Sequence, residues 1–334
     1  MKKWQIWLGL LISAVFIFFA FRGLDFLEIL ISIRSANTMW LLPAIPLYFF
    51  GLWFRAYRWK ILLSPISDYK THQLFSIVAI GYMGNNIYPA RLGELVRSAI
   101  LKKDANIPVS ASLATIIIER IFDGIVMLGF IILNISVISR MAHSIDIKQT
   151  VDSVAAWGSG IFLFAFLIFI IAAFFPNASA GIINKISLKI LPTKYSRSIN
   201  TFVEKFFSGI QSLSSPFQTI TILMVTIGIW LIETIFYWII MQAFPFDISF
   251  GTLMLLSGFL NLFTIIPSSP GYIGTFDAPG IALLTALGIG SQNAAGYTLL
   301  LHAALWLPVT VLGAIFFLQK GISWNEAINQ AKED

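Results

Sequence analysis

The sequence predicts an all-α integral membrane protein that crosses the bilayer several times. Of its 334 residues, 57% are hydrophobic and only 11% are charged, whereas a soluble domain carries about 25% charged residues. The mean hydropathy is +0.83, and apolar runs recur that approach the roughly 20 residues a helix needs to cross the hydrocarbon. We therefore expect a single polytopic domain over residues 1–334, with about eight membrane segments.

The first segment begins almost at the start of the chain. Lys2 and Lys3 precede an apolar run over residues 4–21, which resembles a secretory signal peptide. Because no small-x-small cleavage site follows and bulky phenylalanines end the run, we interpret it as a retained helix. The other clear candidates are residues 38–63, 107–138, 152–175, 217–243 and 292–319.

Two further regions, residues 72–101 and 250–288, are apolar but broken by glycine, proline and polar residues. Each fits either one crossing plus a short segment or a re-entrant pair of half-helices. The re-entrant arrangement is favoured because it places most basic residues on the side of the N-terminus. A full crossing by residues 72–89 would instead move Lys102 and Lys103 to the opposite side, and this alternative stays open.

An excess of lysine and arginine marks the cytoplasmic side of a membrane protein. In the re-entrant arrangement, the side of the N-terminus holds Lys2, Lys3, Arg55, Arg58, Lys60, Lys70, Lys102, Lys103, Lys185, Lys189, Lys194, Arg197, Lys205, Lys320 and Lys332. The other side holds Arg22, Arg34, Arg140 and Lys148. We therefore predict a protein of the cell (cytoplasmic) membrane with both termini in the cytoplasm.

The same order of segments occurs twice. Span, span, broken segment and long span follow one another in residues 1–140 and again in residues 150–320. On the favoured topology the two halves start on opposite sides, so we expect inverted repeats, a recurrent transporter design. The polar insert 176–216 has apolar residues at three- and four-residue spacing, which predicts an amphipathic helix that either lies on the cytoplasmic leaflet or packs on the bundle.

The first break, NNIYPARLGELVR, places polar and charged residues where apolar ones are expected. It offers the amides of Asn85 and Asn86, then Arg91, Glu94 and Arg97 at three-residue spacing. An arginine beside the start of a helix suits a phosphate, because free backbone amides and a planar donor fork complement a tetrahedral anion. The alternative is that an arginine pairs with Glu94 only to neutralise it. Buried charges in membranes usually line a cavity, so we favour a binding role.

The second motif, ERIFD, puts Glu119 and Asp123 one helical turn apart with Arg120 between them. Two acids and one base leave an excess negative charge, which Arg91 or Arg97 could balance. Alternatively, burial keeps one acid protonated, which would allow proton-coupled movement. For at least one of the three residues we favour a structural ion pair.

The second break, PSSPGYIGTFDAPG, is rich in residues that expose the backbone. Gly271 is among the residues that expose the backbone, Ser268 and Ser269 can donate to a phosphate, and Thr275 or Asp277 can cap the following short helix. A plain turn between half-helices would explain the glycines and prolines but not the serines. Lone polar residues elsewhere in the expected spans are interpreted as satisfied core residues, namely Glu233, His302 and Trp306.

No metal or cofactor is expected. The chain has no cysteine, and its three histidines, His72, His143 and His302, are too scattered to form a zinc site. No phosphate-binding loop of the G-x-x-x-x-G-K-[ST] type occurs, so any transport would be facilitated or ion-coupled.

The motifs NNIYPARLGELVR, ERIFD and PSSPGYIGTFDAPGIALLTALGI, in this order, resemble the lysylphosphatidylglycerol synthase transmembrane family. Its flippase-like domain also forms the N-terminal part of the bacterial multiple peptide resistance factor. The resemblance covers essentially the whole chain and implies a polytopic domain that moves a lipid with a charged or phosphate head group between leaflets. In the full-length synthase a soluble domain transfers lysine from a charged tRNA to phosphatidylglycerol. Because this sequence ends about fifteen residues after its last expected span, we expect no such transferase domain.

We therefore hypothesise a lipid flippase or transporter for a phospholipid or a lipid-linked phosphate precursor. Its partner would be a membrane lipid with an anionic or phosphate head group, and no nucleic acid. One alternative is an intramembrane enzyme that uses Glu119 or Asp123 as a base on a lipid head group. Another is a non-catalytic membrane partner of a cytosolic transferase, of the phosphatidylglycerol lysyltransferase or glycosyl transferase type, that docks through residues 176–216.

Overall fold

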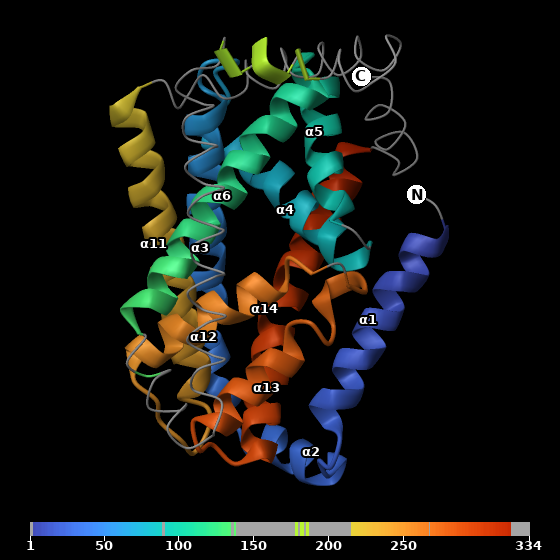
Figure 1. Cartoon of the computed structure of the whole chain (residues 1–334), viewed down its shortest axis with the longest axis vertical. Coiled ribbons are helices and arrows are strands. Elements are labelled where there is room, and N and C mark those ends of the chain that lie inside the picture. Colours follow the sequence, from blue (N-terminus) through green and yellow to red (C-terminus); the bar gives the residue numbers. More distant parts are fainter. Residues whose placement is uncertain are drawn as a thin grey trace.

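The computed structural model describes residues 3–88, 91–134, 215–266 and 268–321, with isolated positions between 137 and 186. Every regular element in these ranges is a helix, as the sequence predicts. The expected span 152–175 and nearly all of the insert 176–216 lie outside the described residues. Figure 1 shows an elongated bundle in which long helices run side by side along the vertical axis.

The N-terminal part of the chain frames one end of the bundle. Helix α1 (Lys3–Phe21) is followed by α2 (Phe26–Ser35), and the two axes meet at 82°. Asp25 fixes this corner because its Oδ1 accepts a hydrogen bond from the Leu27 N–H at 2.8 Å, a typical helix cap. Helix α2 lies at the lower end in Figure 1, where Ser32 Oγ donates to Asn293 Oδ1 at 2.8 Å.

Three long helices run through the bundle: α3 (Leu41–Leu63), α11 (Pro216–Met241) and α14 (Ser291–Lys320). In the described part of the chain these three are long and apolar enough to cross a membrane, counting the short helix η1 (Thr38–Trp40) with α3, and the bent α1–α2 pair would make a fourth. Helix α6 (Val109–Leu133) is as long but carries three charged residues. The larger number of segments expected from the sequence stays a prediction.

The first broken region folds as an antiparallel hairpin of α4 (Thr71–Ile87) and α5 (Leu92–Ala105). The hairpin starts and ends at the same end of the bundle. There Asp104 Oδ2 accepts a hydrogen bond from the Lys320 Nζ at 2.7 Å. Partial burial and the nearby Asp104 carboxylate raise the pKa of the Tyr69 phenol, just before α4.

The second broken region folds as another hairpin, and it enters from the opposite end. It consists of α12 (Phe250–Phe263), the short helix η3 (Pro270–Tyr272) and α13 (Asp277–Ala286). In Figure 1, α4 and α5 occupy the upper half and α12 and α13 the lower half, so that the two hairpin tips meet at mid-height. The distribution of basic residues favoured an arrangement in which each broken region starts and ends on one side. How the two hairpins lie relative to a bilayer stays a prediction.

Close backbone contacts hold the hairpins in the bundle. Gly93 of α5 lies against the Gly81 carbonyl of α4, where a Cβ would overlap that oxygen. On the other face of α4, a Cβ at Gly313 of α14 would come within 2.5 Å of the Ala79 carbonyl oxygen. Small residues at such crossings let membrane helices approach closely.

Candidate functional site

The interior of the bundle contains ion pairs that begin on α3. Arg55 and Arg58 are buried, with only 8% and 1% of their surface exposed. Arg55 Nη2 lies 2.6 Å from Glu233 Oε2, and Arg58 Nη1 lies 2.6 Å from Asp123 Oδ1. We counted both arginines among the charges on the side of the N-terminus, whereas they lie in buried ion pairs inside the bundle. Their position inside the apolar run 38–63 was the available sign that they face the interior.

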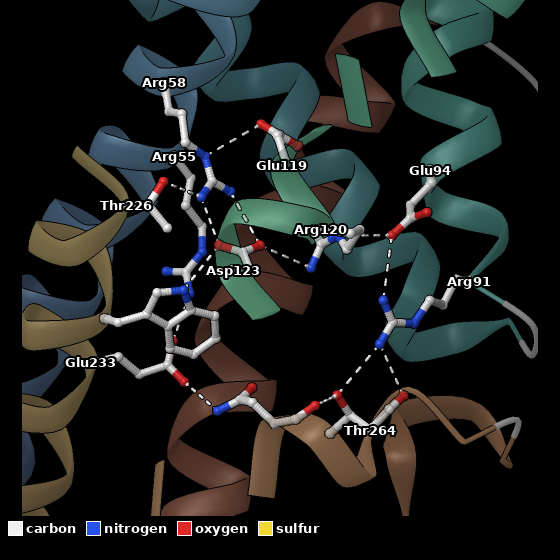
Figure 2. A network of polar contacts seen from close by, with 12 residues as sticks. Arg55, Arg58, Arg91, Glu94, Glu119, Arg120, Asp123, Thr226, Glu233 and Thr264 are labelled. Atoms are coloured by element: carbon white, nitrogen blue, oxygen red, sulfur yellow. Dashed lines mark hydrogen bonds and ion pairs between the residues drawn. The ribbon is translucent and has the colours of Figure 1, made fainter. Parts of the chain in front are cut away.

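A second pair joins the first hairpin to α6. Arg97 Nη2 lies 2.5 Å from Glu119 Oε2, and the Arg97 guanidinium stacks 4.0 Å from the centre of the Trp59 ring. Glu119 has a second basic neighbour, because Arg58 Nε lies 3.9 Å from its Oε1. The Trp230 indole N–H donates to Asp123 Oδ1 at 2.9 Å. Figure 2 shows Arg58 of α3 joined to both Glu119 and Asp123.

A more open chain of charges continues toward the hairpin tips. Arg120 lies 3.4 Å from Glu94 and 3.5 Å from Asp123. Glu94 in turn lies 3.7 Å from Arg91. These separations exceed ordinary hydrogen-bond lengths, and one-third of the Arg120 side chain is exposed. Arg91 and Arg120 therefore have donor capacity left for another partner.

A cavity of about 110 Å³, lined by polar and apolar side chains, lies between the hairpin tips and helices α3, α6, α11 and α14. Its charged and titratable lining includes Arg55, Arg91, Arg120, Glu233 and His302. Three arginines thus face one carboxylate. Because arginine stays protonated in proteins, the cavity is cationic.

Both hairpin tips contribute a strained residue to this cavity. Arg91 (φ 54°) and Tyr272 (φ 60°) have left-handed backbone conformations, which are unfavourable for residues other than glycine. The Arg91 guanidinium lies 5.7 Å from the Tyr272 ring centre, and its Nη2 donates to the Thr264 carbonyl at 2.9 Å. The two hairpins therefore touch through Arg91.

The two asparagines of the first break line the cavity, and one of them also joins the first hairpin to α14. Asn86 Nδ2 donates to Thr310 Oγ1 at 2.8 Å and so ties the first hairpin to α14. Asn85 Oδ1 and Trp306 Nε1 are buried without a hydrogen-bond partner, and both residues line the cavity. Unpaired buried polar atoms are costly, so they mark a place for a polar ligand or water.

An outer pocket of about 220 Å³ adjoins the cavity and shares Asn85, Arg91, Thr264 and Tyr272 with it. Ser268 and Ser269 line this outer pocket. The Ser269 N–H donates to Ser13 Oγ of α1 at 2.8 Å. An apolar groove of about 450 Å³ runs beside it between α1, α12 and α13, with phenylalanines on its walls: Phe16, Phe19, Phe259 and Phe263.

Asp277 and His302 form a contact that the sequence did not suggest. The His302 Nδ1 lies 2.7 Å from Asp277 Oδ1, and its Nε2 lies 2.7 Å from the Gly271 carbonyl oxygen. Asp277 makes no capping bond to α13; its Oδ2 accepts the Gly274 N–H at 2.9 Å. The expected cap is therefore wrong, and His302 belongs to the cavity wall.

The predicted site residues thus fall into three groups. Those that line the inner cavity are Asn85, Asn86, Arg91, Arg120 and Gly271. Those of the outer pocket are Ser268 and Ser269. Those that support the wall through ion pairs or hydrogen bonds are Glu94, Arg97, Glu119, Asp123 and Asp277.

We did not expect Arg55, Glu233, His302 and Trp306 in the cavity wall. The last three are isolated polar residues within apolar runs, and Arg55 shares its run with Arg58 and Lys60, so the available sign was a polar side chain in an expected span. Among the described residues, no group of three or more histidine and acidic side chains could hold a metal ion.

Two helical hairpins that meet at a buried, arginine-lined cavity define a class of polytopic membrane protein with a polar site inside its bundle. The profile of the lysylphosphatidylglycerol synthase TM region matches residues 6–313. The chain therefore belongs to this family of multi-pass membrane proteins, as the three motifs indicated.

The curated relatives have low sequence identity to this chain, but the matches cover most of its length. Over 97% of its length, the chain is 22% identical to glycosyltransferase AglD of Haloferax volcanii, and it spans 56% of that protein. A UPF0104 membrane protein of Methanocaldococcus jannaschii is 25% identical over 70% of the chain and 92% of the relative. Another, from Methanothermobacter thermautotrophicus, is 23% identical over 90% of the chain and 91% of the relative. No solved structure matches the chain.

Proposed function

We propose that this protein is a lipid flippase or transporter of the cell membrane, and that it moves a lipid with an anionic phosphate head group between the leaflets. The cationic cavity between the hairpin tips carries this proposal. Three arginines and one carboxylate line it, and Glu94 and Asp123 lie 3.4 to 3.7 Å from Arg91 and Arg120. The whole ion-pair network keeps one positive charge in excess, and such a charge inside a membrane protein is expensive unless a ligand or partner balances it.

The donor groups of the cavity suit a phosphate. Arginine presents several N–H donors in a plane and binds phosphate oxygens in pairs. Arg91 and Arg120 approach from α5 and α6, and the unpaired Trp306 Nε1 adds a neutral donor. A phosphate between them would accept bonds that no described side chain accepts, which supports an anionic rather than a cationic head group.

The neighbouring outer pocket and groove supply a route for an amphipathic substrate. A head group at Ser268 and Ser269 would lie next to Arg91, which lines both the outer pocket and the cavity. The hydrocarbon chain would stay in the apolar groove beside α1, where its burial costs nothing relative to lipid. The head group could thus pass between the hairpin tips while the chain remains in an apolar environment.

The test is lipid translocation by the purified chain in phosphatidylcholine vesicles with a trace of fluorescently labelled phosphatidylglycerol. Dithionite bleaches the label in the outer leaflet only and so reports the transfer rate. Replacing Arg91 with alanine should lower the rate at least about tenfold, because hydrogen bonds to charged groups contribute about 1.5–3 kcal/mol. Arg91→Lys should retain part of the rate.

The matched control is Arg34→Ala, which removes an exposed arginine of α2 and should leave the rate unchanged. Equal rates for Arg91→Ala and the original protein would remove Arg91 from the site. Absence of any protein-dependent transfer, for this lipid and for a polyprenyl phosphate probe, would refute the flippase proposal.

The relative named as a glycosyltransferase favours one second candidate, a membrane partner of a transferase. In that case the purified chain would move no lipid, and a transferase would co-purify with it unless residues 176–216 are deleted. The intramembrane enzyme has less support. Arg97 and Arg58 hold Glu119 and Asp123 in ion pairs, and neither acid lines the cavity.

A further inference from the structure

His302 has an acceptor at both ring nitrogens. Its Nε2 lies 2.7 Å from the Gly271 carbonyl oxygen, which can only accept a hydrogen bond, so Nε2 carries a hydrogen. Its Nδ1 lies 2.7 Å from Asp277 Oδ1. A neutral ring with its hydrogen on Nε2 would direct the Nδ1 lone pair at the carboxylate. The short contact therefore requires one more proton, shared between Nδ1 and Asp277.

We infer that His302 and Asp277 form a proton-binding site, and that its occupied form holds the tip of the second hairpin against α14. With the proton present, His302 bonds Asp277 at the start of α13 and Gly271 in η3 together. Both belong to the second hairpin, whereas His302 belongs to α14. The ring is thus a clamp between two elements.

Loss of the proton breaks one of the two contacts whichever tautomer results. If the remaining hydrogen stays on Nε2, the ring and the Asp277 carboxylate repel each other. If it moves to Nδ1, the Nε2 lone pair faces the Gly271 carbonyl oxygen, and the η3 loop loses its bond to α14. The proton itself passes to water or to a base in the cavity that His302 lines.

The release of Gly271 would change the cavity wall. Gly271 (φ 72°) packs so closely that a Cβ would come within 2.6 Å of Trp306 Nε1 and 3.4 Å of the Asn86 carbonyl oxygen. A positive φ and close approach of this kind fit glycine. Movement of η3 would therefore separate the second tip from α4 and α14 and take Tyr272 away from Arg91.

Other titratable groups line the same cavity as His302. They come from α3 (Tyr48 and Arg55), α4 (Tyr82), the residue before α5 (Arg91), α6 (Arg120), α11 (Glu233) and η3 (Tyr272). None of them has a hydrogen bond or ion pair to the ring among the described contacts. Asp277 is accordingly the acid that shares its proton.

The experiment uses the full chain, which has no cysteine, so that two spin labels can be placed cleanly. Exposed positions for them are Ile273 next to the second tip and Leu318 near the end of α14. In lipid nanodiscs the distance between the labels should be narrowly distributed near pH 5 and should shift or broaden toward about pH 9, across the range in which histidine titrates. His302→Gln should give the same distribution at both pH values.

The control is His72→Gln, which replaces an exposed histidine at the start of α4 and should keep the pH response. In a chain with His72 and His143 also replaced by glutamine, ¹⁵N spectra of His302 should show both ring nitrogens protonated at the lower pH and one proton lost as the distance changes. A ring that never titrates, or that titrates without a change in distance, would overturn the inference.

The coupling of proton release to lipid movement rests on the proposed function. The proton-binding site itself rests only on the contacts of His302. In vesicles with an imposed pH gradient, the gradient should alter the steady-state leaflet distribution of labelled phosphatidylglycerol, and His302→Gln should abolish that effect. If no lipid moves while the spin-label and ¹⁵N results hold, the flippase proposal fails and the proton site stands. If lipid moves without regard to the gradient, coupling is refuted and the flippase stands.

Discussion

At the scale of residues, ion pairs and hydrogen bonds connect nine charged side chains of the described interior, and Figure 2 shows this network except for Arg97. The nine are Arg55, Arg58, Arg91, Arg97, Arg120, Glu94, Glu119, Asp123 and Glu233. The innermost pairs have short contacts and almost no exposed surface, whereas those toward the tips are longer and more open. We therefore expect the inner pairs to support the fold and the open end of the network to be available to a ligand.

The inner pair Arg97–Glu119 is expected to act in support of the fold. Among the described residues, Arg97→Met leaves Glu119 with one ion-pair partner, Arg58 at 3.9 Å, and a buried charge that loses its partner destabilises a protein by about 3–5 kcal/mol. Thermal unfolding in detergent should show this loss. The double change Arg97→Met with Glu119→Met should recover most of it, because apolar residues replace a buried pair at little cost.

A double variant no more stable than Arg97→Met would show that the pair does not act as a unit. Arg91→Ala, at the open end of the same network, should shift the unfolding midpoint less than Arg97→Met does.

The charged motifs of the sequence located the site only in part. Arg91, Glu94 and Arg120 stand in motifs with several polar residues, so their pattern was visible. Arg55 and Glu233 lie 178 positions apart in apolar runs, and only the packing of α3 against α11 brings them together. No local pattern could reveal that pairing, nor the contact between His302 and Asp277 that depends on where α13 meets α14.

At the scale of elements, the two hairpins determine where the cavity lies. Each is a pair of short helices, and the tips of the two hairpins meet at mid-height in the bundle (Figure 1). The strained conformations of Arg91 and Tyr272 cost about 1–3 kcal/mol each, and both occur at the tips. Such strain persists only where the surrounding packing enforces it.

The close crossing of α4 and α5 is expected to depend on glycine. Gly93→Ala would force its Cβ against the Gly81 carbonyl, and overpacking of this kind typically costs about 1–3 kcal/mol, occasionally more. The unfolding midpoint should fall accordingly. Gly129→Ala is the matched control, because nothing lies within 4 Å of the added Cβ, and it should be neutral or slightly stabilising. Equal effects of both changes would contradict close packing of the first hairpin.

The order of elements supports an inverted repeat, which we propose for the halves 1–140 and 150–320. In the first half a long helix, α3, precedes a hairpin and then α6; in the second, α11 precedes a hairpin and then α14. Helix α4 packs along α14 and α12 along α6. The sequence predicted this order from hydropathy alone, but the breaks could be assigned as hairpins only through the basic residues at their ends.

At the scale of the whole molecule, the two ends of the bundle differ in charge. Lys60, Lys70, Lys102, Lys103 and Lys320 lie at or near the end that bears the α3–α4 and α5–α6 connections. Arg22 and Arg34 flank α2 at the opposite end. The positive-inside rule predicts that the lysine-rich end is cytoplasmic.

This orientation can be tested with a pair of positions that flank α3. Met39 precedes the helix and is 67% exposed, and Ser64 follows it and is also exposed. In the cysteine-free chain, Met39→Cys should react with a membrane-impermeant maleimide in intact cells. Ser64→Cys should react only after the membrane is permeabilised. The reverse pattern would invert the predicted topology.

The connected set of interior charges has an electrical consequence. Its five arginines and four carboxylates leave one positive charge in excess, and a phosphodiester head group carries one negative charge. Moving one elementary charge across a membrane potential of 100 mV involves about 2.3 kcal/mol. With a head group bound, the interior would be neutral, and the voltage would do no work on a rearrangement that carries lipid and arginines together. The voltage would act only on the lipid-free protein, whose interior keeps one positive charge. It would therefore determine the direction in which the hairpin tips move once the lipid has left.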